Sequence, residues 1–101
     1  ILRHVVTGDS QAVARYGGEE FAIVVPSSTL DDATRLAEQV RLRAKAMKIR
    51  NRNTQDVLFS ITVSAGVAAV QPGDDAAALI ARADGALYQS KHAGRDRVSC
   101  V

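Results

Sequence analysis

The chain has 101 residues, 47% hydrophobic and 24% charged, a balance typical of one soluble globular domain. Thirteen Lys and Arg against eleven Asp and Glu leave a net charge of only +2, and the aromatic residues are two Tyr and two Phe. This weak basic excess and the scarcity of rings for base stacking disfavour a nucleic-acid partner. Two histidines and one cysteine exclude a zinc site of soft ligands.

No apolar run approaches the ~20 residues that a membrane span requires. The single cysteine fits a reducing compartment. We therefore expect a cytoplasmic segment without membrane contact of its own, whether its parent is cytoplasmic or membrane-bound. The chain begins Ile-Leu-Arg-His, without a start methionine or a charged leader, and we interpret it as a piece of a longer protein.

The first half of the chain predicts a β-hairpin and then an amphipathic helix. Residues 12–16 and 20–25 are strand-like runs around Gly17-Gly18, and glycine reaches the positive φ that tight hairpin turns require. The second run is apolar on both faces, as in a strand covered on both sides. Residues 27–32 supply capping hydroxyls with carboxylates three positions on, a helix start. Apolar residues then recur at helical spacing at Ala33, Leu36, Ala37, Val40, Ala44 and Met47.

The second half predicts a polar loop, a strand, a helix and a closing strand. Residues 50–56 lack periodicity, and residues 57–70 indicate one long strand with Gly66 inside it. Asp74 can cap the second helix, and Gly94 is well placed just past its end. Residues 97–101 indicate the last strand. The order β-β-α-β-α-β favours an α+β fold, with helices packed on an antiparallel or mixed sheet.

The most informative segment is Arg15-Tyr16-Gly17-Gly18-Glu19-Glu20-Phe21. Adjacent glycines at a hairpin tip let a large anion approach the backbone N–H groups. Glu19 is a hard oxygen ligand of the kind that Mg²⁺ uses together with substrate phosphates. The alternative is an ordinary hairpin turn with solvated acids.

A second segment, residues 83–98, places two cations near a helix end. Lys91 lies in the last predicted turn, and Arg95 follows the presumed cap glycine. They either complement the helix dipole or grip a triphosphate, with Lys as a point charge and Arg as a fork.

Together these segments resemble the GGDEF family of diguanylate cyclases. The signature loop is present as Gly17-Gly18-Glu19-Glu20-Phe21, with Glu at the third position, one of its two usual forms. Residues 61–68, Ile-Thr-Val-Ser-Ala-Gly-Val-Ala, resemble the family's Thr-Val-Ser-x-Gly-Val strand. Residues 83–98 match its Ala-Asp-x-Ala-Leu-Tyr-x-x-Lys-x-x-Gly-Arg-x-Arg-Val pattern.

The resemblance implies a nucleotidyl-cyclase palm-like fold that joins two GTP into cyclic di-GMP, with two domains facing each other as a homodimer. It implies catalytic roles for three loop residues: Glu19 holds Mg²⁺ or Mn²⁺ and helps to deprotonate the attacking hydroxyl, and Gly17 and Gly18 leave room for the nucleotide. Lys91 and Arg95 would bind the substrate phosphates. Glu20 and Arg15 are placed near the site without a firm role.

By the same resemblance, the chain is the C-terminal part of the domain. A complete member carries a first strand, two helices and a further strand before this point. Residues 1–11 would be the end of the preceding helix and a turn, and residues 12–101 would run from the hairpin to the last strand. We expect an N-terminal sensory or regulatory domain in the parent, and no activity from the isolated 101 residues.

One departure concerns product inhibition. Many members carry an Arg-x-x-Asp site before the signature loop, and Gly8 and Gln11 stand at those two positions here. A second arginine, which the family places on the following helix, corresponds to Gln39, with Arg35, Arg41 and Arg43 close by in the sequence. Neither glycine nor glutamine supplies the missing guanidinium or carboxylate, so we expect this inhibitory site to be absent.

Two other functions stay open. The chain could be a catalytically degenerate GGDEF module for GTP or cyclic di-GMP binding or protein–protein regulation, although Glu19, Lys91 and Arg95 are all present. A small RNA-binding α+β domain is disfavoured by the scarce aromatic residues and weak charge.

Overall fold

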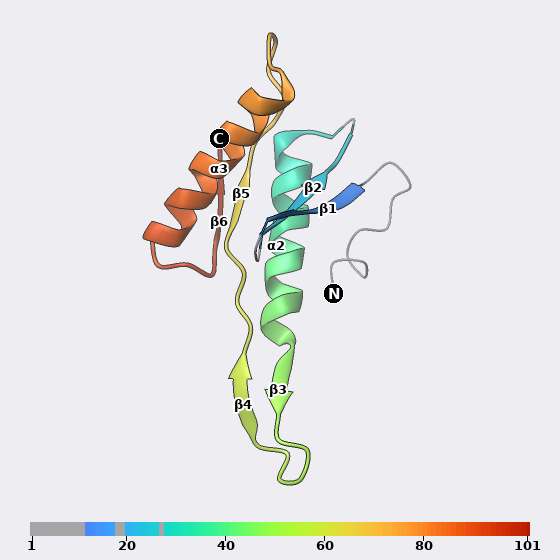
Figure 1. The fold of residues 1–101 in the computed structure, drawn as a ribbon, viewed down its shortest axis with the longest axis vertical. Helices are drawn as coiled ribbons and strands as arrows, with labels where there is room; N and C mark the ends of the chain where they lie inside the picture. Colours follow the sequence, from blue (N-terminus) through green and yellow to red (C-terminus); the bar gives the residue numbers. More distant parts are fainter. Residues whose placement is uncertain (1–11, 18–19, 27) are drawn as a thin grey trace.

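The computed structural model describes residues 12–17, 20–26 and 28–101. The segment that we expected to end a helix, residues 1–11, lies outside them. Two helices lie beside short strands (Figure 1). The elements in chain order are β1 (Ala12–Gly17), β2 (Glu20–Val24), α2 (Leu30–Ala46), β3 (Lys48–Arg50), β4 (Val57–Ser60), β5 (Ala65–Val67), α3 (Ala76–His92) and β6 (Val98–Cys100).

The described strands form three two-stranded ladders. β1 pairs with β2 and β3 with β4, both antiparallel, whereas β5 pairs with β6 in parallel. The expected α+β class with mixed strand directions is confirmed, and so is the hairpin, in which Gly17 pairs with Glu20. The single long strand expected over residues 57–70 is wrong. Its first part pairs with β3 and its later part with β6, so the run is divided between two partners.

The helix ends follow local hydrogen-bonding rules. Thr29 caps α2, because its hydroxyl accepts from the Asp32 N–H at 3.1 Å and the Asp32 carboxylate accepts from the Thr29 N–H. The cap of α3 is Asp75, not Asp74 as we expected: the Asp75 carboxylate accepts from the Ala78 N–H at 2.8 Å. Met47, the last of the apolar residues at helical spacing, does not join the core but is exposed, because α2 ends there and the chain becomes extended.

Close packing of α3 on β5 organises the carboxyl-terminal half. Gly66 lies so near α3 that an added Cβ would overlap the Ala83 carbonyl oxygen and the Leu87 backbone. Ser90 is fully buried at this contact, and its hydroxyl lies 2.8 Å from the Ala65 carbonyl oxygen and 2.7 Å from the Ser99 hydroxyl. One serine on α3 therefore ties the helix to both β5 and β6.

An ionic cluster joins α2 to the turn between α3 and β6. Arg41 and Lys45 project from α2 and pair with the Asp96 carboxylate at 2.9 and 2.8 Å. Glu38 is a second partner of Arg41. Lys45 and Arg41 lower the pKa of Asp96, because both cations favour its ionised form.

β2 is less covered than the sequence predicts. Phe21 and Val24 are 57% and 59% exposed, so the prediction of a strand covered on both sides is not met by the described residues. Beside β2 lies an open, mainly apolar hollow of about 1520 Å³, lined by β2, α2, α3 and residues 61–70. Neither β2 nor β5 has a second strand partner among residues 12–17, 20–26 and 28–101.

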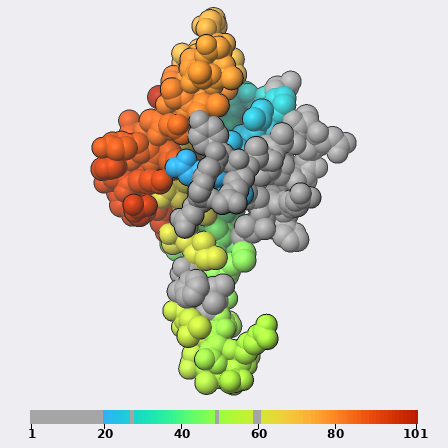
Figure 2. Space-filling model, viewed as in Figure 1, coloured from blue at the N-terminus to red at the C-terminus, as the bar shows by residue number. Residues whose placement is uncertain are grey.

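The β3–β4 hairpin extends away from this hollow, at the far end of the 55 Å long axis (Figures 1 and 2). Neither of the two helices in the described part of the chain is long and apolar enough to cross a membrane.

The Gly66 contact predicts opposite effects of alanine at two glycines. Gly66→Ala should destabilise the protein by about 1–3 kcal/mol or more, because the methyl group meets backbone atoms that cannot move aside. Gly85→Ala is the matched control: it lies within α3 with open space around it, and should stabilise by roughly 0.5–1 kcal/mol. Urea unfolding measures both. Equal stability of the two variants would contradict this packing.

Candidate functional site

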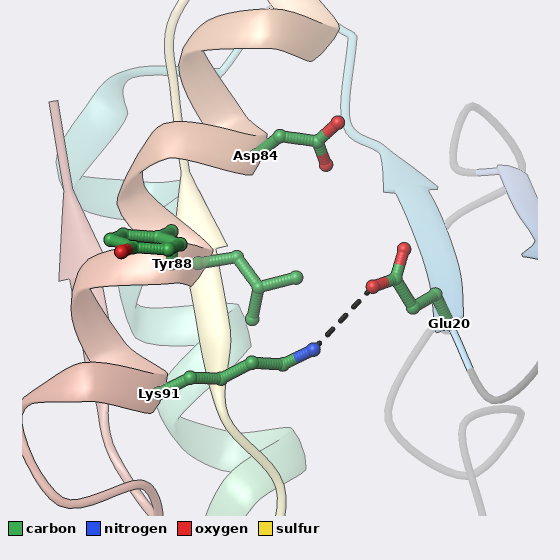
Figure 3. Close-up of a pocket in the computed structure, with 5 residues that line it drawn as sticks. Glu20, Asp84, Tyr88 and Lys91 are labelled. Atoms are coloured by element: carbon green, nitrogen blue, oxygen red, sulfur yellow. Dashed lines mark hydrogen bonds and ion pairs between the residues drawn. The ribbon is translucent and has the colours of Figure 1, made fainter.

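A pocket of about 200 Å³ lies between α3 and the start of β2. Its lining comes from Glu20 on β2 and from Asp84, Leu87, Tyr88 and Lys91 on α3. Figure 3 shows Asp84 and Lys91 extending from α3 toward Glu20. All of these except Tyr88 also line the larger hollow. A space of this size is smaller than most ligand pockets, so it suits one part of a larger ligand that continues into the hollow.

Helical spacing explains which α3 side chains face β2. Asp84, Leu87 and Lys91 stand at positions i, i+3 and i+7, which share one face of an α-helix. The close approach at Gly66 brings the Leu87 backbone against β5 and fixes the rotation of this face. Tyr88 lies at the edge of the pocket, largely exposed, with its ring stacked on His92 at 3.8 Å between centroids.

The two sequence motifs meet at one contact. Lys91 Nζ lies 3.5 Å from Glu20 Oε1, although the residues are 71 positions apart in the sequence. Both side chains are only partly buried, so a bound anion could reach Lys91. An exposed ion pair of this length is weak, and an incoming phosphate group could replace the carboxylate as the partner of Lys91.

Arg95 lies on the same side of the molecule. It lines the hollow together with Glu20 and Lys91. Its N–H donates to the Ser90 carbonyl at 2.9 Å, which closes the carboxyl end of α3. The expected glycine past the helix end is confirmed, since Gly94 has φ +118° just after the cap residue Ala93.

The other expected site residues are only partly described. Gly17 ends β1 and pairs with Glu20, and Arg15 lies within β1 opposite Phe21. Gly18 and Glu19, two of the three predicted catalytic residues, lie outside the described residues. The contact of Lys91 with Glu20 therefore places this cation beside the residue that follows Glu19 in the sequence, and Arg95 lines the same hollow.

Sequence reasoning missed Asp84 and Tyr88 as lining residues. Asp84 belongs to the carboxyl-terminal motif, and its spacing from Lys91 was the available signal. Without the tertiary structure, however, nothing indicated which face of α3 meets β2.

The donor chemistry of the pocket suits Mg²⁺. Glu20 and Asp84 supply carboxylate oxygens, the hard ligands that this ion prefers. Across the part of the chain that the structure describes, no three potential metal-ligating side chains gather. One or two carboxylates are sufficient where substrate phosphates and water complete the coordination, so these residues fit the ion.

Comparison with known sequences identifies the same family along nearly the whole chain. The family described as "Diguanylate cyclase, GGDEF domain" matches residues 1–97. Diguanylate cyclase VdcA of Vibrio cholerae is 42% identical over 90 residues, which cover 89% of this chain and 26% of that protein. Response regulator PleD of Caulobacter vibrioides is 40% identical over 85 residues, covering 83% of this chain and 18% of PleD. The chain thus spans about a quarter or less of these relatives.

Solved structures agree with the sequence match. The GGDEF domain of DgcB from Caulobacter crescentus, solved in complex with c-di-GMP, superimposes with a TM-score of 0.87 at 35% identity. The active GGEEF domain of a diguanylate cyclase from Vibrio cholerae gives 0.86, also at 35%. Each alignment covers 98% of this chain and 60% of the other. The signature hairpin, the carboxyl-terminal motif and the fold all agree with these matches. The chain therefore belongs to the GGDEF diguanylate cyclase family.

Proposed function

We propose that this chain contributes the catalytic loop and the phosphate-binding cations of a diguanylate cyclase. In this reaction the 3′-hydroxyl of each GTP attacks the α-phosphorus of the other. Two new P–O bonds form, two pyrophosphates leave and the product is cyclic di-GMP. The observation that supports this most directly is the contact between Lys91 and Glu20, because it joins the two family motifs in one pocket.

The residue types fit a displacement at phosphorus. Such a reaction depends on positioning and charge neutralisation more than on covalent chemistry. In the proposal, Glu19 accepts the proton of the attacking hydroxyl, Gly17 and Gly18 admit the nucleotide, and Lys91 and Arg95 neutralise the terminal phosphates. Glu20 holds Lys91 before the substrate enters, and Arg15 stays near the site without an assigned role.

We propose that Glu19, together with Asp84 or Glu20, would hold Mg²⁺ or Mn²⁺. When bound, the ion would supply Lewis-acid polarisation of the phosphoryl oxygens and neutralise their charge. The hard oxygen ligands on both sides of the pocket support this assignment.

We further propose that the chain is the carboxyl-terminal part of its domain and acts in a dimer of domains. It aligns with only 60% of the DgcB GGDEF domain. In addition, the hollow lies beside β2 and β5, whose described parts each have one strand partner. A strand from elsewhere in the parent could pair there and cover Phe21 and Val24. Upstream domains would then supply the regulatory input.

The first test is cyclase activity of the parent protein with GTP and Mg²⁺, followed by chromatography for cyclic di-GMP. Glu19→Gln should abolish turnover, because the amide loses both the charge and the proton-accepting oxygen. Glu19→Asp keeps the carboxylate and gives the family's other common loop, so it should retain activity. Turnover unchanged by Glu19→Gln would remove Glu19 from the mechanism. A wild-type protein that binds GTP without product would indicate a degenerate binding module.

The second test concerns the triphosphate. Lys91→Met should weaken GTP binding by about tenfold, since a charge-assisted contact to phosphate is lost. Binding of GMP should change much less, because GMP lacks the terminal phosphates. Lys48→Met on the protruding hairpin is the control and should affect neither. Calorimetry with both nucleotides measures the difference; an equal loss for GTP and GMP would argue against terminal-phosphate contact.

We also propose that the cyclase lacks the usual product-inhibition site, because Gly8, Gln11 and Gln39 replace its charged residues. Adding cyclic di-GMP to the cyclase assay should leave the rate at saturating GTP unchanged. Inhibition that persists at saturating GTP would contradict this, since product competing at the active site is displaced by substrate.

A further inference from the structure

The turn that carries Arg95 has an unusual backbone. Gly94, Arg95 and Asp96 have φ angles of +118°, +61° and +48°, three left-handed residues in succession. Only glycine adopts this region freely, and among other residues Asp and Asn tolerate it best. Arg95 has no such tolerance, so surrounding contacts must hold it there.

Contacts of Asp96 with α2 and with Ser64 keep the turn in this left-handed conformation. Its carboxylate accepts from Arg41 Nη1 at 2.9 Å and from Lys45 Nζ at 2.8 Å. Its N–H donates to the Ser64 hydroxyl at 3.1 Å. The Arg41 and Asp96 side chains are only 17% and 24% exposed, so solvent screens this pair less than an open surface pair.

We infer that Asp96 is a positioning residue that fixes the left-handed turn and so presents Arg95 to the nucleotide phosphates. The inference rests on the proposed function, in which Arg95 binds phosphate. Neighbouring residues of the turn have different surroundings: the Asp96 carboxylate binds α2, while Arg95 lines the hollow with Lys91 and Glu20.

This role differs from simple stabilisation. Arg41 and Lys45 lie on a helix capped at its own start by Thr29 and Asp32, so they form an anchor independent of α3. If Asp96 lost its ion pairs with Arg41 and Lys45, the Gly94–Asp96 backbone could relax toward common φ angles. The Arg95 guanidinium would then turn away from the hollow in which the phosphates are proposed to bind. Lys91 would stay in place, because it belongs to α3 itself.

A double-mutant cycle on the parent protein tests this coupling. Asp96→Ala and Arg95→Ala should each weaken GTP binding by about tenfold. The double variant should bind no more weakly than Arg95→Ala alone, since Asp96 acts through Arg95. In the Lys91→Met background, by contrast, Asp96→Ala should weaken GTP binding by its full factor of about ten. Additive losses in the Arg95→Ala background would overturn the inference.

Two variants separate positioning from folding. Asp96→Asn keeps the tolerance for left-handed φ and one acceptor oxygen, so it should restore most of the affinity lost in Asp96→Ala. Asp74→Ala removes a similar ion pair, with Arg82 at 2.7 Å, at the other end of α3. It should leave GTP affinity unchanged. If Asp96→Ala does not fold, Lys45→Met replaces it, with a smaller loss and the same non-additivity with Arg95→Ala; additivity would again overturn the inference.

Amide hydrogen exchange gives a readout that does not need nucleotide. The Arg95 N–H bonds to the Ser90 carbonyl and the Asp96 N–H to the Ser64 hydroxyl. Both should exchange at least about tenfold faster in Asp96→Ala and not in Asp74→Ala. If the wild-type protein does not bind GTP, the proposed function fails, while faster exchange at the turn still supports the hold of Asp96 on Arg95. Unchanged exchange overturns the inference whatever the activity.

Discussion

The site depends first on the distance between α3 and β5. Only glycine at position 66 lets the Ala83 carbonyl oxygen and the Leu87 backbone approach β5 so closely. Ser90 adds hydrogen bonds at the same contact. Because a helix is rigid over two turns, this contact fixes the directions in which Asp84 and Lys91 leave α3. A packing detail within the fold therefore determines the geometry of a pocket on its surface.

A second, electrostatic constraint acts at the end of the same helix. The turn after α3 adopts φ angles that its sequence only partly favours, and cations from α2 hold it through Asp96. Van der Waals packing places Lys91, whereas ion pairing places Arg95. The two phosphate-binding candidates are thus positioned by independent interactions, which lets each be perturbed without the other.

Both constraints suit a reaction that depends on placement of charge. A displacement at phosphorus requires oriented cations and carboxylates from the protein more than a reactive nucleophile. The pocket between α3 and β2 offers both signs of charge at its edge and opens into a larger apolar hollow. Membership of the GGDEF family agrees with this arrangement.

The sequence by itself determined the hairpin around Gly17-Gly18, a helix start within residues 27–32, the glycine after α3 and the family, because these depend on local conformational rules and fixed motifs. The tertiary structure alone decided that residues 57–70 divide between two partners, that Asp84 faces Glu20, and that Arg41 reaches Asp96 across 55 positions. Such contacts depend on how helices and strands pack in space. The local sequence does not indicate which helix face will contact which strand.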